Sequence, residues 1–290
     1  MYDPLACAAG SKHDDAILLL LEHGAGSSIS KHDLGTKHWR TNHLLLYIEA
    51  GGSNEVVIDM LTRYGSDMFK YGCTPTQYNR RARCVTPLGL AIHTDNMQAI
   101  SAMLKYRIIQ GNPQEDEGAS ECLHDALSKG YIDVCKQLVI RPEIDINRKY
   151  AYGDTILHTL IRKKNNELAT FILTHPSITV DAGVYNAMKQ TLIHKAIVYK
   201  MYDLLKLLLD YDPCITKKVL VRTKIQTAME PCLHLAARKD DIKALEMMYP
   251  YVTNINLRTY KSNQTPLDVA KALGKANAVK WLIDHGAKIE

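Results

Sequence analysis

The hydrophobic and polar positions along the chain alternate in short blocks. Apolar residues recur at every third or fourth position within these blocks, and clear examples are residues 15–25, 202–212 and 277–287. This spacing places the apolar side chains on one face of an α-helix. Gly24 and Gly286 stand near the ends of two blocks, where glycine commonly ends a helix. The pattern therefore predicts a series of short amphipathic helices.

A second recurring segment precedes these blocks. It reads TPLGLAI from Thr86, TILHTLI from Thr155, PCLHLAAR from Pro231 and TPLDVAKA from Thr265. Its leucine-equivalent position recurs at spacings of 34 to 44 residues. The full set of these positions is Leu5, Leu44, Leu88, Leu123, Leu157, Ile193, Leu233 and Leu267. Each repeat therefore reads as a pair of short helices that buries its apolar face against neighbouring repeats.

These segments resemble the opening of the ankyrin-repeat unit, Thr-Pro-Leu-His-x-Ala, which recurs about every 33 residues in that family. Thr86 to Leu88 match the start of the motif, and Leu233 and His234 match its centre. The resemblance implies an all-α solenoid of helix-turn-helix units joined by hairpins or loops, forming one domain over residues 1–290. We expect eight repeats, starting near residues 3, 42, 86, 121, 155, 191, 231 and 265. By analogy, degenerate arrays of this type occur in bacterial effectors and viral proteins.

Four histidines occupy the same position of successive repeats, namely His124, His158, His194 and His234. Their spacing places them in different layers of the stack, and the family resemblance implies that each bonds the neighbouring turn. We therefore interpret them as structural and expect no metal site and no cofactor. The seven cysteines follow no repeated CxxC spacing, which indicates reduced thiols. A cysteine nucleophile beside a histidine stays open, because such residues need to be neighbours only in space.

The longer spacings indicate insertions between repeats at residues 27–41, 68–85, 110–120 and 215–230. Residues 69–85 are the most suggestive, because tyrosines interleave there with basic residues. The candidate partner contacts in this loop are Lys70, Tyr71, Tyr78, Arg80, Arg81 and Arg83. Tyrosine and arginine are enriched where interfaces concentrate their binding energy. An acidic protein, a phosphate group or RNA would satisfy the charge, and a solvated basic loop is an equal alternative.

The family resemblance also implies a concave binding face built from the hairpins and the first helices. Its expected contacts include Arg162, Lys195, Tyr199 and Arg238. Mixed polarity of this kind suits a protein or peptide partner better than a lipid. The chain also has 16 tyrosines against two phenylalanines. Tyr150, Tyr152 and other tyrosines near repeat turns suit a contact surface, although they also suit half-buried positions.

Composition narrows the function. The net charge of +5 is mild, so a general nucleic-acid binder is not expected. No signal peptide or membrane-spanning segment is apparent. We expect a monomeric protein-binding scaffold or adaptor without enzymatic activity, located in the cytoplasm, or in the host cytoplasm if it is a secreted effector. The alternatives are the targeting portion of an enzyme whose catalytic segment lies outside this chain, and a nucleic-acid binder through residues 69–85.

Overall fold

The fold is described from a computed structural model. It covers residues 4–24, 47–48, 50–64, 87–105, 116–142, 144–211, 230–259 and 262–288. The chain divides into two compact units, residues 1–145 and 146–290. The described residues are helical and contain no strand, with a single isolated bridge between Tyr185 and Thr191. This confirms the predicted all-α class.

The described residues of unit 1 form short helices, most of which pack in pairs and against the helices of the next repeat. The described helices are α1 (Pro4–Gly10), α2 (Asp14–Glu22), α4 (Asn54–Tyr64), α5 (Pro87–His93), α6 (Met97–Lys105), α7 (Asp116–Lys129) and α8 (Ile132–Val139). Within pairs α1 packs on α2, α5 on α6 and α7 on α8, while α5 also packs on α7 and α6 on α8. Each repeat therefore uses its neighbours as its core.

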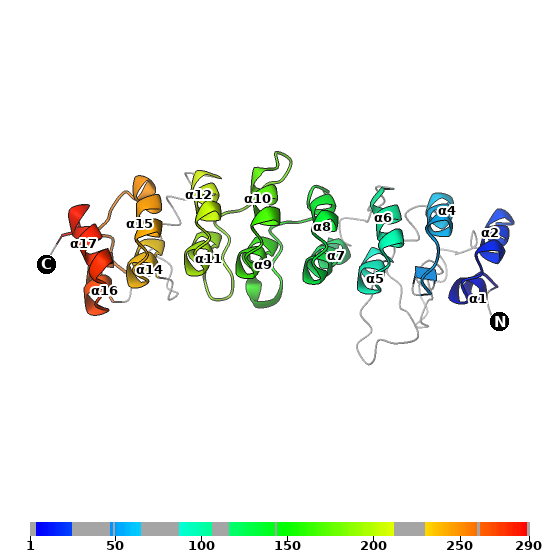
Figure 1. Cartoon of the computed structure of the whole chain (residues 1–290), viewed down its shortest axis with the longest axis horizontal. Coiled ribbons are helices and arrows are strands. Elements are labelled where there is room, and N and C mark those ends of the chain that lie inside the picture. The colour runs from blue at the N-terminus through cyan, green and yellow to red at the C-terminus, as the bar shows by residue number, and fades with distance from the viewer. Residues whose placement is uncertain are drawn as a thin grey trace. The chain divides into compact units, whose positions relative to one another are not determined.

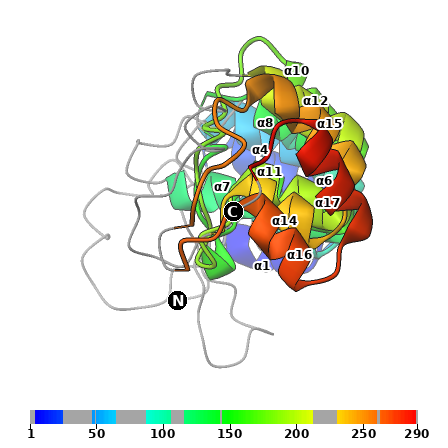
Figure 2. The ribbon, with the colours of Figure 1, turned by 90° about the vertical axis from the view of Figure 1, so that its left-hand side faces the viewer.

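Unit 2 repeats this arrangement (Figure 1). Its helices are α9 (Ile156–Lys163), α10 (Asn166–Thr174), α11 (Leu192–Tyr199), α12 (Tyr202–Tyr211), α14 (Cys232–Arg238), α15 (Ile242–Met248), α16 (Pro266–Ala272) and α17 (Ala276–Asp284), with 3-10 turns η4 (Ala151–Gly153) and η5 (Tyr249–Tyr251). The first helices pack in the order α9, α11, α14, α16, and the second helices in the order α10, α12, α15, α17. Hairpins project from one side of these helices (Figure 2).

Burial explains the two kinds of helix in each repeat. Residues 192–197 of α11 are buried without exception, because this helix has neighbours on several sides. The second helix α12 buries only the stripe Leu204, Leu205, Leu208 and Leu209, as expected of an amphipathic helix. Ala196 and Ala236 are fully buried, and their small side chains let α11 and α14 approach closely. The motif alanine therefore has a packing role.

The turn between the two helices of a repeat has one recurring backbone conformation. Lys164 and Lys200 adopt left-handed angles, with φ of 55° and 56°. The residue after each turn then donates its amide back into the first helix, as Met201 N does to Ala196 O at 2.9 Å. Lys12, Asp95 and Asp240 adopt similar φ values in other repeats. The repeats therefore share one turn geometry, although the residue at the left-handed position differs between them.

The structure extends the prediction at one repeat. Helix α7 begins at Asp116, so residues 116–120, expected as part of an insertion, are helical. Acidic residues at 116 and 117 are favourable at a helix N-terminus, and Pro113 lies before the helix. The other complete pairs begin close to the expected positions. The second repeat, expected near residue 42, falls largely outside the described residues.

No helix in the described ranges is long and apolar enough to cross a membrane. The expectation of one domain over residues 1–290 remains a prediction.

Candidate functional site

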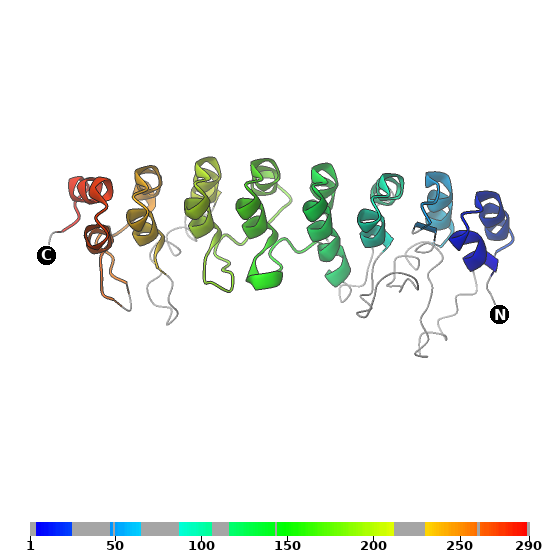
Figure 3. The ribbon, with the colours of Figure 1, turned by 60° about the horizontal axis from the view of Figure 1, so that its bottom comes forward.

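Two neighbouring hairpins of unit 2 are joined at their tips. They comprise residues 147–154, which lead into α9, and residues 180–190, which lead into α11 (Figure 3). Ala187 N donates a hydrogen bond to Tyr152 O at 2.8 Å. Gly153 stands at this contact with a φ of 68°, and a Cβ there would lie 2.8 Å from Ala187 N. Glycine is therefore required for the two tips to meet.

The tips carry the most exposed large hydrophobic side chains among the described residues. Tyr152 is 82% exposed and Met188 is 73% exposed. Next to them, the ring of Tyr185 has Lys149 Nζ at 4.6 Å and Lys189 Nζ at 4.7 Å from its centroid. These are cation–π distances. We call these five residues the tip surface.

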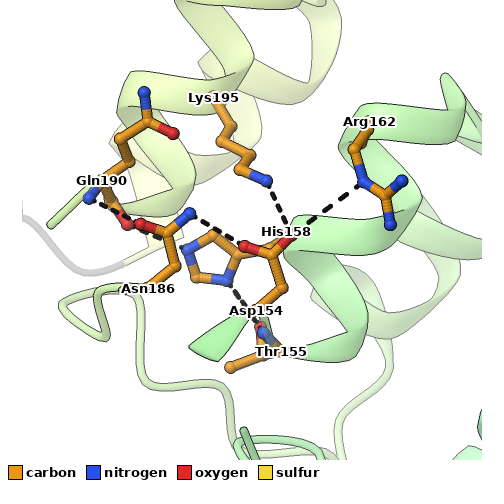
Figure 4. A network of polar contacts seen from close by, with 7 residues as sticks. All are labelled: Asp154, Thr155, His158, Arg162, Asn186, Gln190 and Lys195. Carbon is orange, nitrogen blue, oxygen red and sulfur yellow. Dashed lines mark hydrogen bonds and ion pairs between the residues drawn. The ribbon is translucent and has the colours of Figure 1, made fainter. Parts of the chain in front are cut away.

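A buried polar network lies beneath the tip surface (Figure 4). The Asp154 carboxylate accepts a 2.8 Å hydrogen bond from Asn186 Nδ2 and another of 2.8 Å from Lys195 Nζ. Burial raises the pKa of Asp154, but the bonds from Lys195 and Asn186 outweigh it, and the net pKa is lowered. Asp154 is therefore ionised, and its charge fixes both hairpins to the first helix of the following repeat.

His158 joins the same network through the backbone of Gln190. Its Nδ1 accepts from the Thr155 amide at 3.2 Å, so its Nε2 carries the proton and donates to Gln190 O at 3.1 Å. Burial lowers the pKa of His158 to about 4, which keeps the ring neutral. Asn186 Oδ1 in turn accepts from Gln190 N at 2.9 Å. The second hairpin is thus held by both Asp154 and His158.

The structural interpretation of the repeated histidines is confirmed at three positions. His194 Nε2 donates to Glu230 O at 2.9 Å and His234 Nε2 contacts Gln264 O at 2.9 Å, as His158 does with Gln190. Each ring therefore bonds the turn that precedes the next repeat. His124 lies half-buried on α7. Among the described residues, no cluster of histidine, cysteine and carboxylate side chains is arranged to hold a metal ion.

One cysteine lies beside a histidine. Cys232 Sγ is 3.3 Å from His194 Nδ1. Burial raises the pKa of the Cys232 thiol and lowers the pKa of His194 to about 4. A nucleophilic cysteine needs the opposite shift, toward the thiolate. The geometry fits a core contact and not an activated nucleophile.

The predicted partner contacts fall in different environments. Arg162 is exposed, with its Nε 4.0 Å from Asp154 Oδ2, and Arg238 is exposed in an ion pair with Glu230. Tyr199 is half-buried at the end of α11. Lys195 lies in the interior, where it holds Asp154. The remaining predicted contacts, Lys70, Tyr71, Tyr78, Arg80, Arg81 and Arg83, lie outside the described residues.

Sequence reasoning missed most of the tip surface. It noted Tyr152 among tyrosines near repeat turns, but not Met188, Tyr185 or the lysines beside them. The sequence did contain a signal that could have identified Met188, because the two tip residues occupy the same position relative to the motif threonine of their repeats. Tyr152 precedes Thr155 by three residues, and Met188 precedes Thr191 by three.

A family model matches this same region of the chain. Residues 123–219 match the family model for ankyrin repeats in three copies. Residues 123–219 carry ankyrin repeats. The match includes α9 to α12 and both hairpins, so the tip surface belongs to the hairpins between ankyrin repeats. The total of eight ankyrin repeats remains a prediction.

A related ankyrin-repeat sequence occurs in a poxvirus. A fowlpox virus (strain NVSL) protein named as an ankyrin repeat protein is 27% identical over 168 residues. The aligned part is 57% of this chain and 35% of the viral protein. The alignment thus spans about a third of the length of that relative.

Proposed function

We propose that this protein is a scaffold or adaptor that binds a partner protein through the hairpins and first helices of unit 2. Ankyrin repeats are in general protein–protein interaction modules. The observation that carries the proposal is the pair of exposed apolar side chains, Tyr152 and Met188, on two tips joined by a backbone hydrogen bond. Large exposed aromatic and methionine side chains are typical interface anchors.

The buried network supports the proposal through preorganisation. A loop that must become ordered on binding loses affinity, because the ordering costs conformational entropy. Here Asp154, His158 and Asn186 already fix both hairpins. Burying an anchor side chain then contributes about 2 kcal/mol or more to binding at a well-packed interface. Lys195 acts in this proposal as a positioning residue and not as a direct contact.

Other parts of the proposed interface rest on composition and position. Arg162 and Tyr199 lie on the two helices that follow the hairpins, and Arg238 lies on the next first helix. The loop at residues 69–85 is retained as a second contact region because of its arginines and tyrosines. Because the fowlpox virus relative is a viral protein, the proposal extends to a role as an effector that acts on a host protein. Scattered cysteines support a reducing compartment such as the cytoplasm.

Affinity capture with the purified full chain tests this function. The double variant Tyr152→Ser/Met188→Ser removes the apolar anchors, and Leu19→Ser removes an exposed leucine (57% exposed) from unit 1 as a matched control. We expect quantitative mass spectrometry to find a partner protein that the control retains and the double variant loses at least about tenfold. Identical partners on all three proteins would contradict the proposal. Circular dichroism checks that the variants fold.

A further inference from the structure

Charge is distributed unevenly between the hairpin face of unit 2 and the rest of the chain. Residues 147–164 and 180–200 together form the two hairpins and the helices α9 and α11. They hold eight cations against two anions, a net charge of +6, whereas the remaining residues hold 28 cations and 29 anions, a net charge of −1. The cations are Arg148, Lys149, Arg162, Lys163, Lys164, Lys189, Lys195 and Lys200. These two segments therefore carry a clear net positive charge, whereas the other residues taken together are close to neutral.

The two anions in these segments do little to neutralise the outer surface. Asp154 is buried and is paired with the equally buried Lys195. Asp181 is exposed, and one of its carboxylate oxygens accepts a 2.9 Å hydrogen bond from Gly183 N. Lys149 is exposed in the first hairpin, and Lys164 and Lys200 are exposed at the C-terminal ends of α9 and α11, away from the hairpin tips. A ligand on this face thus meets a field that is positive overall.

The tip surface places apolar anchors within that field. Tyr152 and Met188 form the exposed apolar part, and Lys149 and Lys189 stand beside Tyr185 next to it. The complementary ligand has a large apolar side chain flanked by carboxylates. A single-stranded nucleic acid would also meet the charge, but its bases bind by stacking on several aromatic rings. Here Met188 offers no ring, and Lys149 and Lys189 lie over the ring of Tyr185, which leaves Tyr152 as the exposed ring of the tip surface. The pattern therefore favours a protein segment.

We propose that the tip surface binds an acidic segment of the partner protein that carries one large apolar side chain. The inference rests on the proposed function and specifies the chemistry of the partner. The apolar side chain packs against Tyr152 and Met188, and the flanking carboxylates pair with Lys149, Lys189 and Arg162. Electrostatic complementarity of this kind accelerates association and selects against basic partners.

A random-peptide display library, selected on the full chain, tests this inference without knowledge of the partner. Counter-selection against Tyr152→Ser/Met188→Ser isolates the peptides that need the tip surface. We expect these peptides to be rich in aspartate and glutamate around one leucine, phenylalanine or tryptophan. Selected peptides that are neutral or basic, or a pool that counter-selection does not change, would overturn the inference.

Fluorescence anisotropy with one selected peptide then separates local from general electrostatics. Lys149→Glu/Lys189→Glu is expected to weaken binding at least about tenfold. Lys275→Glu/Lys280→Glu on the last repeat makes the same change in net charge and is expected to leave binding within about twofold. Equal losses in both variants would mean that only total charge matters and would overturn the inference. A labelled single-stranded RNA that binds more tightly than the peptide would do the same.

The peptide experiments and the affinity capture fail independently. A partner that is captured through Tyr152 and Met188, together with a selected peptide pool that is not acidic, leaves the scaffold function in place and removes the inference. If the affinity capture finds the same partners with and without Tyr152 and Met188, both the proposed function and the inference fail.

Discussion

Lys195 Nζ lies 2.8 Å from Asp154 Oδ2, and both side chains are buried. The two residues are 41 positions apart in the chain, in neighbouring repeats. The pair joins the hairpin before α9 to the first helix of the next repeat, at the base of the tip surface. The contact therefore connects the stability of the stack to the geometry of the proposed binding site.

We expect Lys195→Met to destabilise the protein by about 3 kcal/mol, because it leaves the Asp154 carboxylate buried without its cation. Lys200→Met, which removes an exposed lysine from the same repeat, is expected to change stability by less than about 0.5 kcal/mol. Urea unfolding followed by circular dichroism measures both. Adding Asp154→Asn to Lys195→Met is expected to recover part of the loss. Equal stabilities of the two lysine variants would show that the buried pair contributes nothing.

Mild acid is expected to destabilise unit 2 through its buried histidines. Burial lowers the pKa of His158 and of His194 to about 4 in the folded state, against about 6.5 in an unfolded chain. The unfolded state therefore binds more protons between these values. The stabilising effect of the neutral rings is complete above about pH 6.5 and is lost as the pH falls toward 4, by about 1.4 kcal/mol per pH unit for each proton.

Unfolding free energies measured from pH 7.5 to 4 test this dependence. His158→Gln is expected to lower stability at pH 7.5 and to flatten the slope between pH 6.5 and 4 by about one proton. An unchanged slope in the variant would show that His158 does not titrate in the way described.

The repeat formed by α14 and α15 offers a stabilising substitution. Pro231 occupies the position of Thr155 and Thr191, and proline has neither the amide nor the hydroxyl that those residues offer to their histidines. Among the described residues His234 Nδ1 is accordingly buried without a hydrogen-bond partner. Pro231→Thr is expected to raise stability by about 1 kcal/mol, because the restored cap exceeds the entropy that proline removes from the unfolded chain.

Thr191→Pro is the matched reverse change and is expected to lower stability by about 1 to 2 kcal/mol. Thermal unfolding compares the two variants. A Pro231→Thr protein less stable than the parent would contradict the account of the histidine cap.

The left-handed turn between the two helices of a repeat predicts that glycine at this position increases the stability of the protein. Lys200 has φ of 56° and ψ of 39°, a conformation that costs a residue with a Cβ about 1 kcal/mol. Lys200→Gly is therefore expected to stabilise the protein by about 0.5 to 1 kcal/mol. Lys206→Gly places the same change inside α12 and is expected to destabilise by about 1 kcal/mol. Changes of the same sign at the two positions in urea unfolding would contradict the turn geometry.

The fold could be predicted because its determinants are local and repeated. The motif leucine recurs at spacings of 34 to 44 residues, and helix α7 departs from the prediction in starting earlier, at Asp116. The histidine bonds could be predicted from the family resemblance. The burial of Lys195 could not be predicted, because its partner Asp154 lies one repeat earlier and only the stacking of the helices brings the two residues together.

The tip surface could be predicted only in part for a similar reason. Tyr152 is conspicuous as a tyrosine near a turn, but Met188 resembles any residue of a polar loop. Its exposure depends on the hydrogen bond between Ala187 and Tyr152 and on the close approach at Gly153. These contacts depend on how one hairpin lies against the next, which hydrophobic periodicity does not specify.

The central claim is that a partner protein lies on the joined hairpin tips of unit 2. Site-specific photocrosslinking measures this most directly, with a photoreactive amino acid placed at position 152 or 188 and, as controls, at the exposed positions Leu19 and Leu273. We expect the same partner to crosslink from positions 152 and 188 and not from positions 19 and 273. A partner that crosslinks equally from all four positions, or only from the controls, would contradict the claim.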